Sequence, residues 1–286
     1  MTTILVTGSK GQLGSELREL AAGHPDLQFT FTDVEELDIT REDEVGRFFS
    51  GNRFDVVINC AAYTAVDQAE DDEEKALLLN GTAPGILASA CAKHNSFLVH
   101  LSTDYIFNSD GTRPIMEDDQ PEPQSAYGRT KLEGELQVTA RASHGMIIRT
   151  AWLYSSHGNN FVKTILKYAR ERGELNVVND QRGTPTYARD LAKAILDILP
   201  LRTKIEGLGI FNYSNEGETT WYAFAVALLR MKGVSCKVNP VSTDAYPAKA
   251  KRPLYSVLSK EKIKTAFGIR IPDWEESLNA CLQKID

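Results

Sequence analysis

The chain has 286 residues, of which 42% are hydrophobic and 25% are charged, so it can bury a large core in one domain or two unequal ones. Its 32 basic and 39 acidic residues give a net charge of −7, which argues against a nucleic-acid groove as the main function. Residues 1–6 have no basic leader, and no apolar run is long enough to span a bilayer, so we expect a cytoplasmic protein without a membrane partner.

Strand-like and helix-like segments alternate over the first half of the chain. The strands are expected at residues 4–7, 27–32, 54–60, 97–103 and 146–151. The helices between them are expected at residues 12–22, 41–50, 72–94 and 125–141. Thr40 is the expected N-cap of the second helix, with Asp43 completing a weak capping box. This alternation predicts an α/β fold with a Rossmann-type, doubly wound parallel sheet.

After residue 151 the alternation loosens. Helices are expected at residues 159–172 and 185–199 and from about residue 219, and strands at residues 176–180 and 210–213. Prolines punctuate the tail, which predicts short elements and turns. We expect a dinucleotide-binding domain over residues 1–150, rejoined by about 185–215. Residues 151–184 and 216–286 are then expected to form a smaller, mixed α/β substrate-binding lobe.

Gly8, Gly11 and Gly14 follow the first predicted strand and open the first predicted helix. Glycines at such a turn let the backbone approach a pyrophosphate, which the helix N-terminus attracts. Glycine turns also occur for packing alone, but the strand before and the helix after favour a dinucleotide. We therefore expect the cofactor to contact Gly8, Gly11, Gln12 and Leu13.

Asp33 ends the second predicted strand, about 20 residues after Gly14, where a carboxylate is expected to bind the ribose of an adenosine. No arginine follows Asp33, which favours NADH over NADPH, although Lys10 is available for a 2′-phosphate. Asp38 and Ile39 in the next loop are expected to flank the adenine. The alternative for Asp38 is a turn residue that precedes a helix.

Tyr127 and Lys131 are four residues apart on a predicted helix, so their side chains lie on one face. A phenol at this position can donate a proton, and a neighbouring ammonium can lower its pKa from about 10 while contacting the nicotinamide ribose. The alternative is an ordinary surface pair. The glycine turn upstream favours catalysis, and we expect both residues to contact the cofactor as well.

Thr103 ends the fourth predicted strand, at the carboxyl edge where open parallel sheets bind ligands. Its hydroxyl is expected to hydrogen-bond the substrate carbonyl beside Tyr127. Ala61, Ala62 and Thr64 follow the third predicted strand, where the cofactor is expected to pass close to the backbone. Close packing is a compatible explanation for the two alanines.

Four cysteines and five histidines are scattered along the chain without the spacing of a metal site. We expect the cysteines to be reduced and mostly buried, and a zinc enzyme is not indicated. The acidic stretch of residues 67–75 is expected to be a solvated helix start, with Asp67 as the member that faces the cleft.

Several longer segments carry a resemblance to a known family. They are residues 8–14, 61–67, 102–107, 127–131, 149–154, 158–161, 179–185 and 251–253. Together they resemble the extended branch of the short-chain dehydrogenase/reductase family, and within it the dTDP-4-dehydrorhamnose reductases, over most of the chain. The resemblance implies that NADH or NADPH reduces the 4-keto group of dTDP-4-dehydro-L-rhamnose to give dTDP-L-rhamnose. Tyr127 would be the proton donor, Lys131 would tune it, and Thr103 would orient the oxygen.

The resemblance also implies that Asp104 and Trp152 contact the sugar, and for Trp152 a core aromatic is the alternative. Arg252, in a Lys-Arg-Pro segment, is expected to bind the substrate diphosphate, with a solvated surface arginine as the alternative. Some relatives are dimers held partly by acidic residues around magnesium. Glu16 matches one such position, but Arg189 stands where another carboxylate is expected. We therefore predict no metal site, and a homodimer remains open.

Other functions have to be weighed against this one. A nucleotide-sugar dehydratase of the same superfamily has an Asp-Glu pair after the threonine, whereas here Tyr105 follows Asp104. Another nucleotide-sugar reductase or an epimerase stays open as an enzymatic alternative. A non-catalytic regulatory subunit of the methionine adenosyltransferase type is the alternative from a different class, since intact Thr103, Tyr127 and Lys131 do not exclude it.

Overall fold

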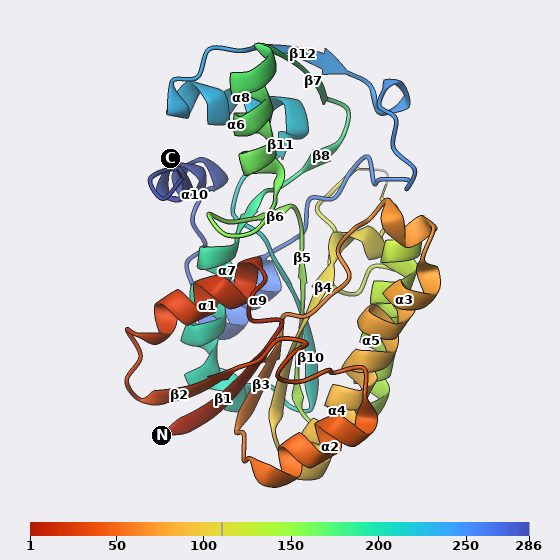
Figure 1. Cartoon of the computed structure of the whole chain (residues 1–286), viewed down its shortest axis with the longest axis vertical. Helices are drawn as coiled ribbons and strands as arrows, with labels where there is room; N and C mark the ends of the chain where they lie inside the picture. The colour runs from red at the N-terminus through yellow and green to blue at the C-terminus, as the bar shows by residue number, and fades with distance from the viewer. Residues whose placement is uncertain (110, 286) are drawn as a thin grey trace.

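The computed structural model describes residues 1–109 and 111–285, and its centre is a sheet of six parallel strands (Figure 1). The strand order is β10-β5-β4-β3-β1-β2. The strands are β1 (Thr2–Thr7), β2 (Leu27–Phe31), β3 (Val56–Asn59), β4 (Phe97–Thr103), β5 (Gly145–Thr150) and β10 (Leu208–Tyr213). The predicted Rossmann-type parallel sheet is confirmed.

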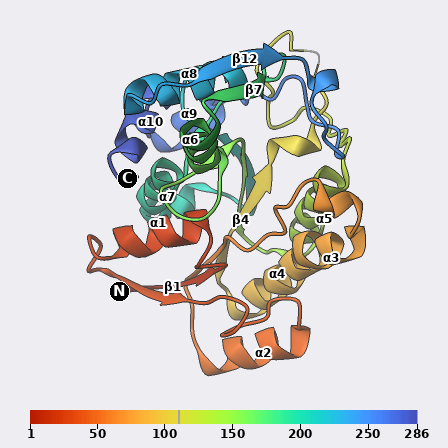
Figure 2. The same ribbon diagram turned by 45° about the horizontal axis from the view of Figure 1, so that its top comes forward.

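Helices cover both faces of this sheet, because alternate strand residues point to opposite sides. Ile4 and Ile58 belong to a buried cluster on one face, and Leu5 and Val57 to a second cluster on the other. Figures 1 and 2 show the two helical layers on either side of the strands. They are α1 (Gln12–Ala21), α7 (Ala188–Ile198) and α9 (Glu261–Phe267) on the first face, and α2 (Glu42–Gly51), α4 (Ala83–His94) and α5 (Ala126–Arg141) on the second.

A smaller mixed lobe lies beyond the carboxyl edge of the sheet, at the top of Figure 1. It has its own buried cluster and three two-stranded sheets, β12-β7, β11-β8 and β6-β9. Its strands are β6 (Leu153–Tyr154), β7 (Glu174–Val178), β8 (Arg182–Gly183), β9 (Thr186–Tyr187), β11 (Thr219–Thr220) and β12 (Lys237–Val241). Its helices are α6 (Phe161–Arg172), α8 (Trp221–Lys232) and α10 (Trp274–Leu282). The residue bounds given above for the two domains stay a prediction.

Short helical turns complete the chain. They are η1 (Gln68–Glu70), α3 (Glu73–Leu77), η2 (Leu78–Thr82), η3 (Asp104–Ile106), η4 (Leu199–Lys204) and η5 (Thr243–Ala245). The helix predicted over residues 72–94 is therefore divided, since η2 is a π-turn between α3 and α4. Within the described residues, no helix combines the length and the apolar character that a membrane crossing requires.

The predicted cap of the second helix is wrong. Helix α2 begins at Glu42, its cap residue is Arg41, and no side chain caps it. Thr40 instead donates its hydroxyl and its backbone N–H to Asp38 Oδ1, at 2.6 and 3.0 Å. The Thr40 side chain is therefore not free to cap α2, because its hydroxyl is bound to the nearer carboxylate of Asp38 in a local turn.

Candidate active site

A crevice is expected between β1 and β3, where the order of the strands along the sheet reverses. The chain adds β2 on one side of β1 and β3 on the other. The glycine turn leaves β1 here, and residues 60–67 leave β3. Gly8 has a φ of +63°, and a Cβ on it would lie 2.5 Å from the backbone nitrogen of Ala61. Only glycine therefore lets these two turns approach each other so closely.

Asp33 and Lys10 lie beside this turn. The backbone N–H of Lys10 donates to Asp33 Oδ2 at 2.9 Å, and the Lys10 ammonium pairs with Glu35 at 2.7 Å. A carboxylate has about four acceptor positions, so Asp33 can brace the turn and still accept ribose hydroxyls. Lys10 would have to leave Glu35 in order to bind a 2′-phosphate.

The other residues predicted beside the cofactor have structural partners of their own. Gln12 Oε1 accepts from Asn160 Nδ2 at 3.0 Å, and Leu13 is buried in the core. Asp38 makes the turn with Thr40 described above, and Ile39 is 4% exposed within the second cluster. Any contact of Gln12 or Leu13 with a pyrophosphate would thus come through the backbone N–H groups at the start of α1.

The turn after β3 carries Ala61, Ala62 and Thr64, and Ala61 and Ala62 are partly buried whereas Thr64 is exposed. Two buried asparagines hold this turn, and the sequence reasoning missed both. Asn59 Oδ1 accepts from the Ala61 N–H at 3.2 Å. Asn80 Oδ1 accepts from the Tyr63 N–H at 2.8 Å, and its Nδ2 donates to the Tyr63 carbonyl at 3.1 Å.

Asn80 also connects this turn to α5. Its Nδ2 donates to Thr130 Oγ1 at 3.2 Å, one residue before Lys131. Asn80 lies in the π-turn η2 and is fully buried. The Asn-Gly step inside an otherwise helical run was the one signal that marked this position.

Helix α5 carries the predicted catalytic pair in its first two turns. Ser125 caps the helix by accepting from the Gly128 N–H at 3.2 Å, and Glu70 Oε1 accepts from the Ala126 N–H at 2.8 Å. Tyr127 is partly buried and Lys131 is 2% exposed. The Lys131 ammonium donates to the carbonyl of Leu101 in β4 at 2.6 Å. The helix is thereby docked against the strand that ends in Thr103.

The charge states of the pair follow from burial. Burial lowers the pKa of Lys131 to about 8. Burial raises the pKa of Tyr127 to about 12, and a hydrogen bond with Thr103 only partly opposes this rise. The direction is opposite to the lowered phenol pKa expected from the sequence, because the loss of hydration on burial outweighs the hydrogen bond with Thr103. A phenol with this pKa stays protonated at neutral pH, as a proton donor must.

Thr103 and Asp104 form the floor of the site at the end of β4. Thr103 is 4% exposed, and its hydroxyl donates to Asp104 Oδ1 at 3.1 Å while accepting from the Tyr105 N–H at 3.3 Å. Burial raises the pKa of Asp104 to about 6. Its other oxygen, Oδ2, lies near Ser256 but makes no hydrogen bond of ordinary geometry with any described residue. Asp104 can therefore accept a hydrogen bond from a ligand.

Trp152 follows β5 and points into the smaller lobe. Its indole stacks on that of Trp221, with ring centroids 3.6 Å apart and planes 12° apart. Its backbone φ is +47°, which is rare for a bulky residue. Trp152 is partly buried, so its side chain is neither a fully enclosed core residue nor a free surface group.

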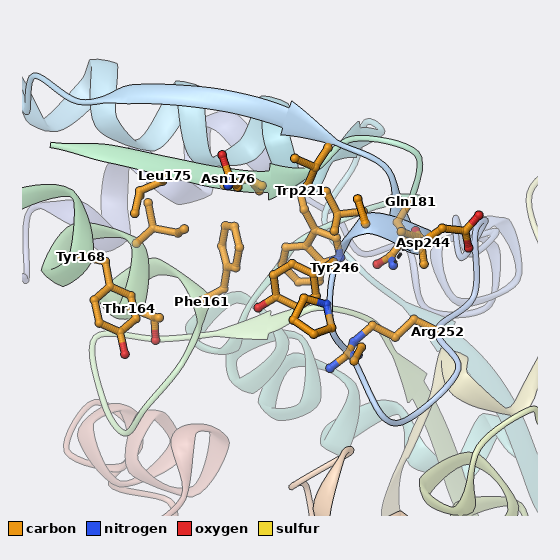
Figure 3. A pocket seen from close by; sticks show the side chains of 18 of the residues that line it. Phe161, Thr164, Tyr168, Leu175, Asn176, Gln181, Trp221, Asp244, Tyr246 and Arg252 are labelled. Carbon is orange, nitrogen blue, oxygen red and sulfur yellow. Dashed lines mark hydrogen bonds between the residues drawn. The ribbon is translucent and has the colours of Figure 1, made fainter. Parts of the chain in front are cut away.

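The smaller lobe contains a cavity of about 1000 Å³ between α6, β7 and residues 241–252 (Figure 3). Four aromatic side chains line it, namely Phe161, Tyr168, Trp221 and Tyr246. Arg252 lines it too and donates to Asp67 Oδ2 at 2.8 Å. Aromatic faces beside a guanidinium suit a base and a diphosphate.

Asp67 ties the loop that contains Arg252 to the sheet domain. Its Oδ1 accepts from the N–H groups of Lys249 and Ala250, at 3.1 and 2.9 Å. The expected solvated helix start is found at α3, which Asp72 precedes and which has Glu73 and Glu74 in its exposed first turn, whereas Asp67 lies upstream, before the short turn η1. Asp67 is held instead by hydrogen bonds from residues 249–252.

A group of three possible metal ligands, Glu16, Glu19 and His157, lies between the two lobes. Arg189 donates to Glu16 at 3.0 Å and to Glu19 at 2.7 Å, and Lys284 also binds Glu19. The hydrogen bond from Lys284 is the main reason why the pKa of Glu19 falls to about 2. These carboxylates already have cationic partners, so the residues present do not fit a magnesium ion.

Comparison with known proteins gives a match over the whole chain. The family described as "RmlD substrate binding domain" matches residues 1–286. The spore coat polysaccharide biosynthesis protein SpsK of Bacillus subtilis is 41% identical, and the alignment covers 99% of this chain and 98% of that protein. A dTDP-4-dehydrorhamnose reductase of Burkholderia thailandensis is 38% identical over 99% of this chain and 98% of its own length.

Solved structures agree with these relatives. A dTDP-4-dehydrorhamnose reductase of Clostridium acetobutylicum superposes with a TM-score of 0.94 at 42% identity and covers 99% of both chains. A dTDP-4-dehydrorhamnose reductase of Bacillus anthracis, determined in complex with NADP, also has a TM-score of 0.94, at 34% identity. It covers 99% of this chain and 100% of its own.

Proposed function

The chain belongs to the RmlD substrate binding domain family, and from this membership we propose that it uses NADH or NADPH to reduce the 4-keto group of dTDP-4-dehydro-L-rhamnose. The product is dTDP-L-rhamnose. The observation that carries the assignment of residues is the arrangement of Thr103, Tyr127 and Lys131 at the carboxyl end of β4.

The cofactor supplies a hydride to the 4-keto carbon when it is bound. Negative charge then develops on the oxygen of the 4-keto group, and the residues of the chain orient and protonate this oxygen. Tyr127 donates its phenolic proton to that oxygen, and the raised pKa keeps the proton available at neutral pH. The Thr103 hydroxyl, which hydrogen-bonds Tyr127, orients the same oxygen. Lys131, one helical turn from Tyr127 on the same face of α5, supplies positive charge to the site and so favours the negative charge that develops during proton transfer.

The residues present fit a dinucleotide. Gly11 is exposed at the N-terminus of α1, the contact of Gly8 with Ala61 holds this turn against the turn after β3, and Asp33 retains free acceptor positions. The acidic surroundings of Lys10, which include Asp33 and Glu35, favour NADH because they repel a 2′-phosphate. The relative determined with NADP supports the use of NADPH in this family as well.

We assign the substrate's sugar to Asp104 and Trp152 and its diphosphate to Arg252. Asp104 Oδ2 is a buried oxygen with a free acceptor position, which suits a sugar hydroxyl, and Trp152 offers an apolar face. Arg252 lies on the wall of the cavity, whose aromatic side chains suit the thymine. A diphosphate would take the guanidinium from Asp67 by offering more negative charge.

The assay follows the absorbance of NADH and of NADPH with dTDP-4-dehydro-L-rhamnose. Turnover by the purified chain alone is expected, and a folded protein that oxidises neither cofactor would exclude the reaction. Tyr127→Phe should lower kcat by at least about 100-fold while cofactor binding persists, because it removes the proton donor alone. An unchanged rate in that variant would refute the role given to the phenol.

The same assay separates the remaining alternatives. A regulatory subunit would show no turnover by itself and would copurify with a methionine adenosyltransferase. An epimerase would interconvert sugars without net consumption of the cofactor. Net oxidation that scales with the reduced sugar product excludes both.

A further inference from the structure

We propose that Trp221 is a positioning residue for the sugar of the substrate, and that it acts through Trp152. The inference rests on the proposed function, which gives Trp152 to the sugar. Trp221 is the first residue of α8 and belongs to the smaller lobe, whereas Trp152 lies two residues after the end of β5 of the main sheet. Their stacking thus joins the reaction crevice to the second lobe.

Trp152 needs such support because its backbone has a φ of +47°. A residue with a bulky side chain stays in this left-handed region only where its surroundings hold it there. The stacked indole of Trp221, with centroids 3.6 Å apart, supplies one such support. Gly183 supplies another, because a Cβ there would lie 2.6 Å from Cε2 and Cζ2 of Trp152.

A short ribbon fixes both supports relative to each other. Strand β8, which contains Gly183, pairs with β11, which ends immediately before Trp221. Thr220 then caps α8 by accepting from the Ala223 N–H at 3.1 Å, and it donates to Asn179 Oδ1 at 2.8 Å. The start of α8, and with it the Trp221 indole, is therefore anchored on both sides.

Trp221 also lines the large cavity, beside Phe161, with ring centroids 4.5 Å apart (Figure 3). Trp152 is not among the lining residues. The Trp221 ring thus separates the cavity suited to a nucleoside diphosphate from the indole that faces the sugar. A nucleotide in the cavity would contact the Trp221 ring, which also sets the position of Trp152. Binding of the nucleotide would therefore fix the Trp152 indole in the position where it contacts the sugar.

Removal of the ring should affect the sugar nucleotide and not the cofactor. An aromatic pair contributes a factor of about two to ten beyond the area that it buries. Trp221→Leu is therefore expected to raise the KM for the sugar nucleotide about tenfold and to leave the KM for NADH unchanged. Trp221→Phe, which keeps a stacking ring, should recover most of the loss. If Trp221→Leu only destabilised the fold, the KM for the sugar nucleotide would not rise while the KM for NADH stayed the same.

Circular dichroism reports the stacking independently of turnover. The chain has three tryptophans, and the third, Trp274, makes its ring contact with Phe224 at 5.7 Å. Stacked indoles give an exciton couplet, which Trp152→Phe and Trp221→Phe should each abolish. Trp274→Phe is the matched control and should keep the couplet and both KM values. Addition of dTDP to the wild-type protein should change the couplet.

The outcomes are distinct. If the couplet disappears in Trp221→Leu while the KM for the sugar nucleotide stays the same, the inference is wrong and the reductase assignment stands. If the wild-type protein shows no turnover, the reductase assignment fails. The affinity for dTDP-L-rhamnose, measured by calorimetry, then decides the inference: an unchanged affinity in Trp221→Leu overturns it, and an affinity weakened about tenfold supports it.

Discussion

Lys131 is a buried cation whose ammonium donates to a main-chain carbonyl at 2.6 Å, and burial lowers its pKa to about 8. Tyr127, four residues earlier, has its pKa raised to about 12. At neutral pH the lysine is thus charged and the phenol is protonated, which are the two states that reduction requires. The lysine is the member of the pair that titrates near physiological pH.

The pH dependence of the reaction should follow from this. Lys131 is protonated below a pH of about 8 and loses its charge above it, so kcat/KM for reduction should fall as the pH rises past about 8. Lys131→Arg keeps its charge to a far higher pH, so any activity it retains should lack this alkaline fall. The profile of kcat/KM between pH 6 and about 10 measures both. The same fall in Lys131→Arg would contradict the assignment, because the phenol titrates too high to cause it.

At the scale of elements, the π-turn η2 matters most for the site. A π-turn places one extra residue in a helix and is frequent at functional sites. Here it turns Asn80 inward, where the side chain bonds both main-chain groups of Tyr63 and the hydroxyl of Thr130. One side chain therefore holds the turn after β3 in a fixed position relative to the helix that carries Tyr127 and Lys131.

Replacement of Asn80 should disturb both stability and cofactor binding. Asn80→Ala leaves the Tyr63 N–H and carbonyl unpaired, and each buried unpaired group costs about 1–3 kcal/mol. We expect urea unfolding to show a loss of about 2–4 kcal/mol, and the KM for NADH to rise more than that for the sugar nucleotide. Ser89→Ala in α4 is the control, because Ser89 is exposed and its hydroxyl donates to the Gly85 carbonyl within its own helix. Equal effects of the two variants would refute the role of Asn80.

At the scale of the whole molecule, an ionic network joins the lobes. Glu16 of α1 is fully buried, accepts from Ser155 Oγ at 2.7 Å and pairs with Arg189 of α7. Glu19 binds Arg189, His157 and Lys284. The pKa of Glu19 is lowered, so its contribution to stability is full above a pH of about 4.5 and is lost as the pH falls towards 2.

Arg189 fills the place that a metal would need between these carboxylates. We expect EDTA and Mg²⁺ to leave the activity and the thermal midpoint of the wild-type protein unchanged. Arg189→Gln should lower the free energy of unfolding by about 1–3 kcal/mol, because it leaves the buried Glu16 without its cation. Arg189→Glu brings three carboxylates together, so Mg²⁺ should raise its thermal midpoint.

The control for Arg189→Gln is Arg47→Gln, which breaks an exposed ion pair with Asp43 and should change the free energy of unfolding little. Stabilisation of the wild-type protein by Mg²⁺ would contradict the conclusion that Arg189 takes the place of a metal ion.

The fold was predictable because local patterns carry it. Buried parallel strands are continuous apolar runs, and the residue pattern located all six strands of the main sheet to within about two residues at either end. The return of the chain to that sheet at β10 was expected from residues 210–213. The cap at Thr40 and the division of residues 72–94 were not, because both depend on partners chosen in the folded protein.

The sequence by itself determined the glycine turn after β1, the shared helical face of Tyr127 and Lys131, and the position of Thr103 at a strand end, since each follows from the period of one element. Only the tertiary structure decided the charge states of Tyr127 and Lys131, the partners of Asp67 and Arg189, and the stacking of Trp152 on Trp221. Burial and long-range contacts set these properties. The contacts join residues up to 185 positions apart, and no local sequence pattern specifies such pairs.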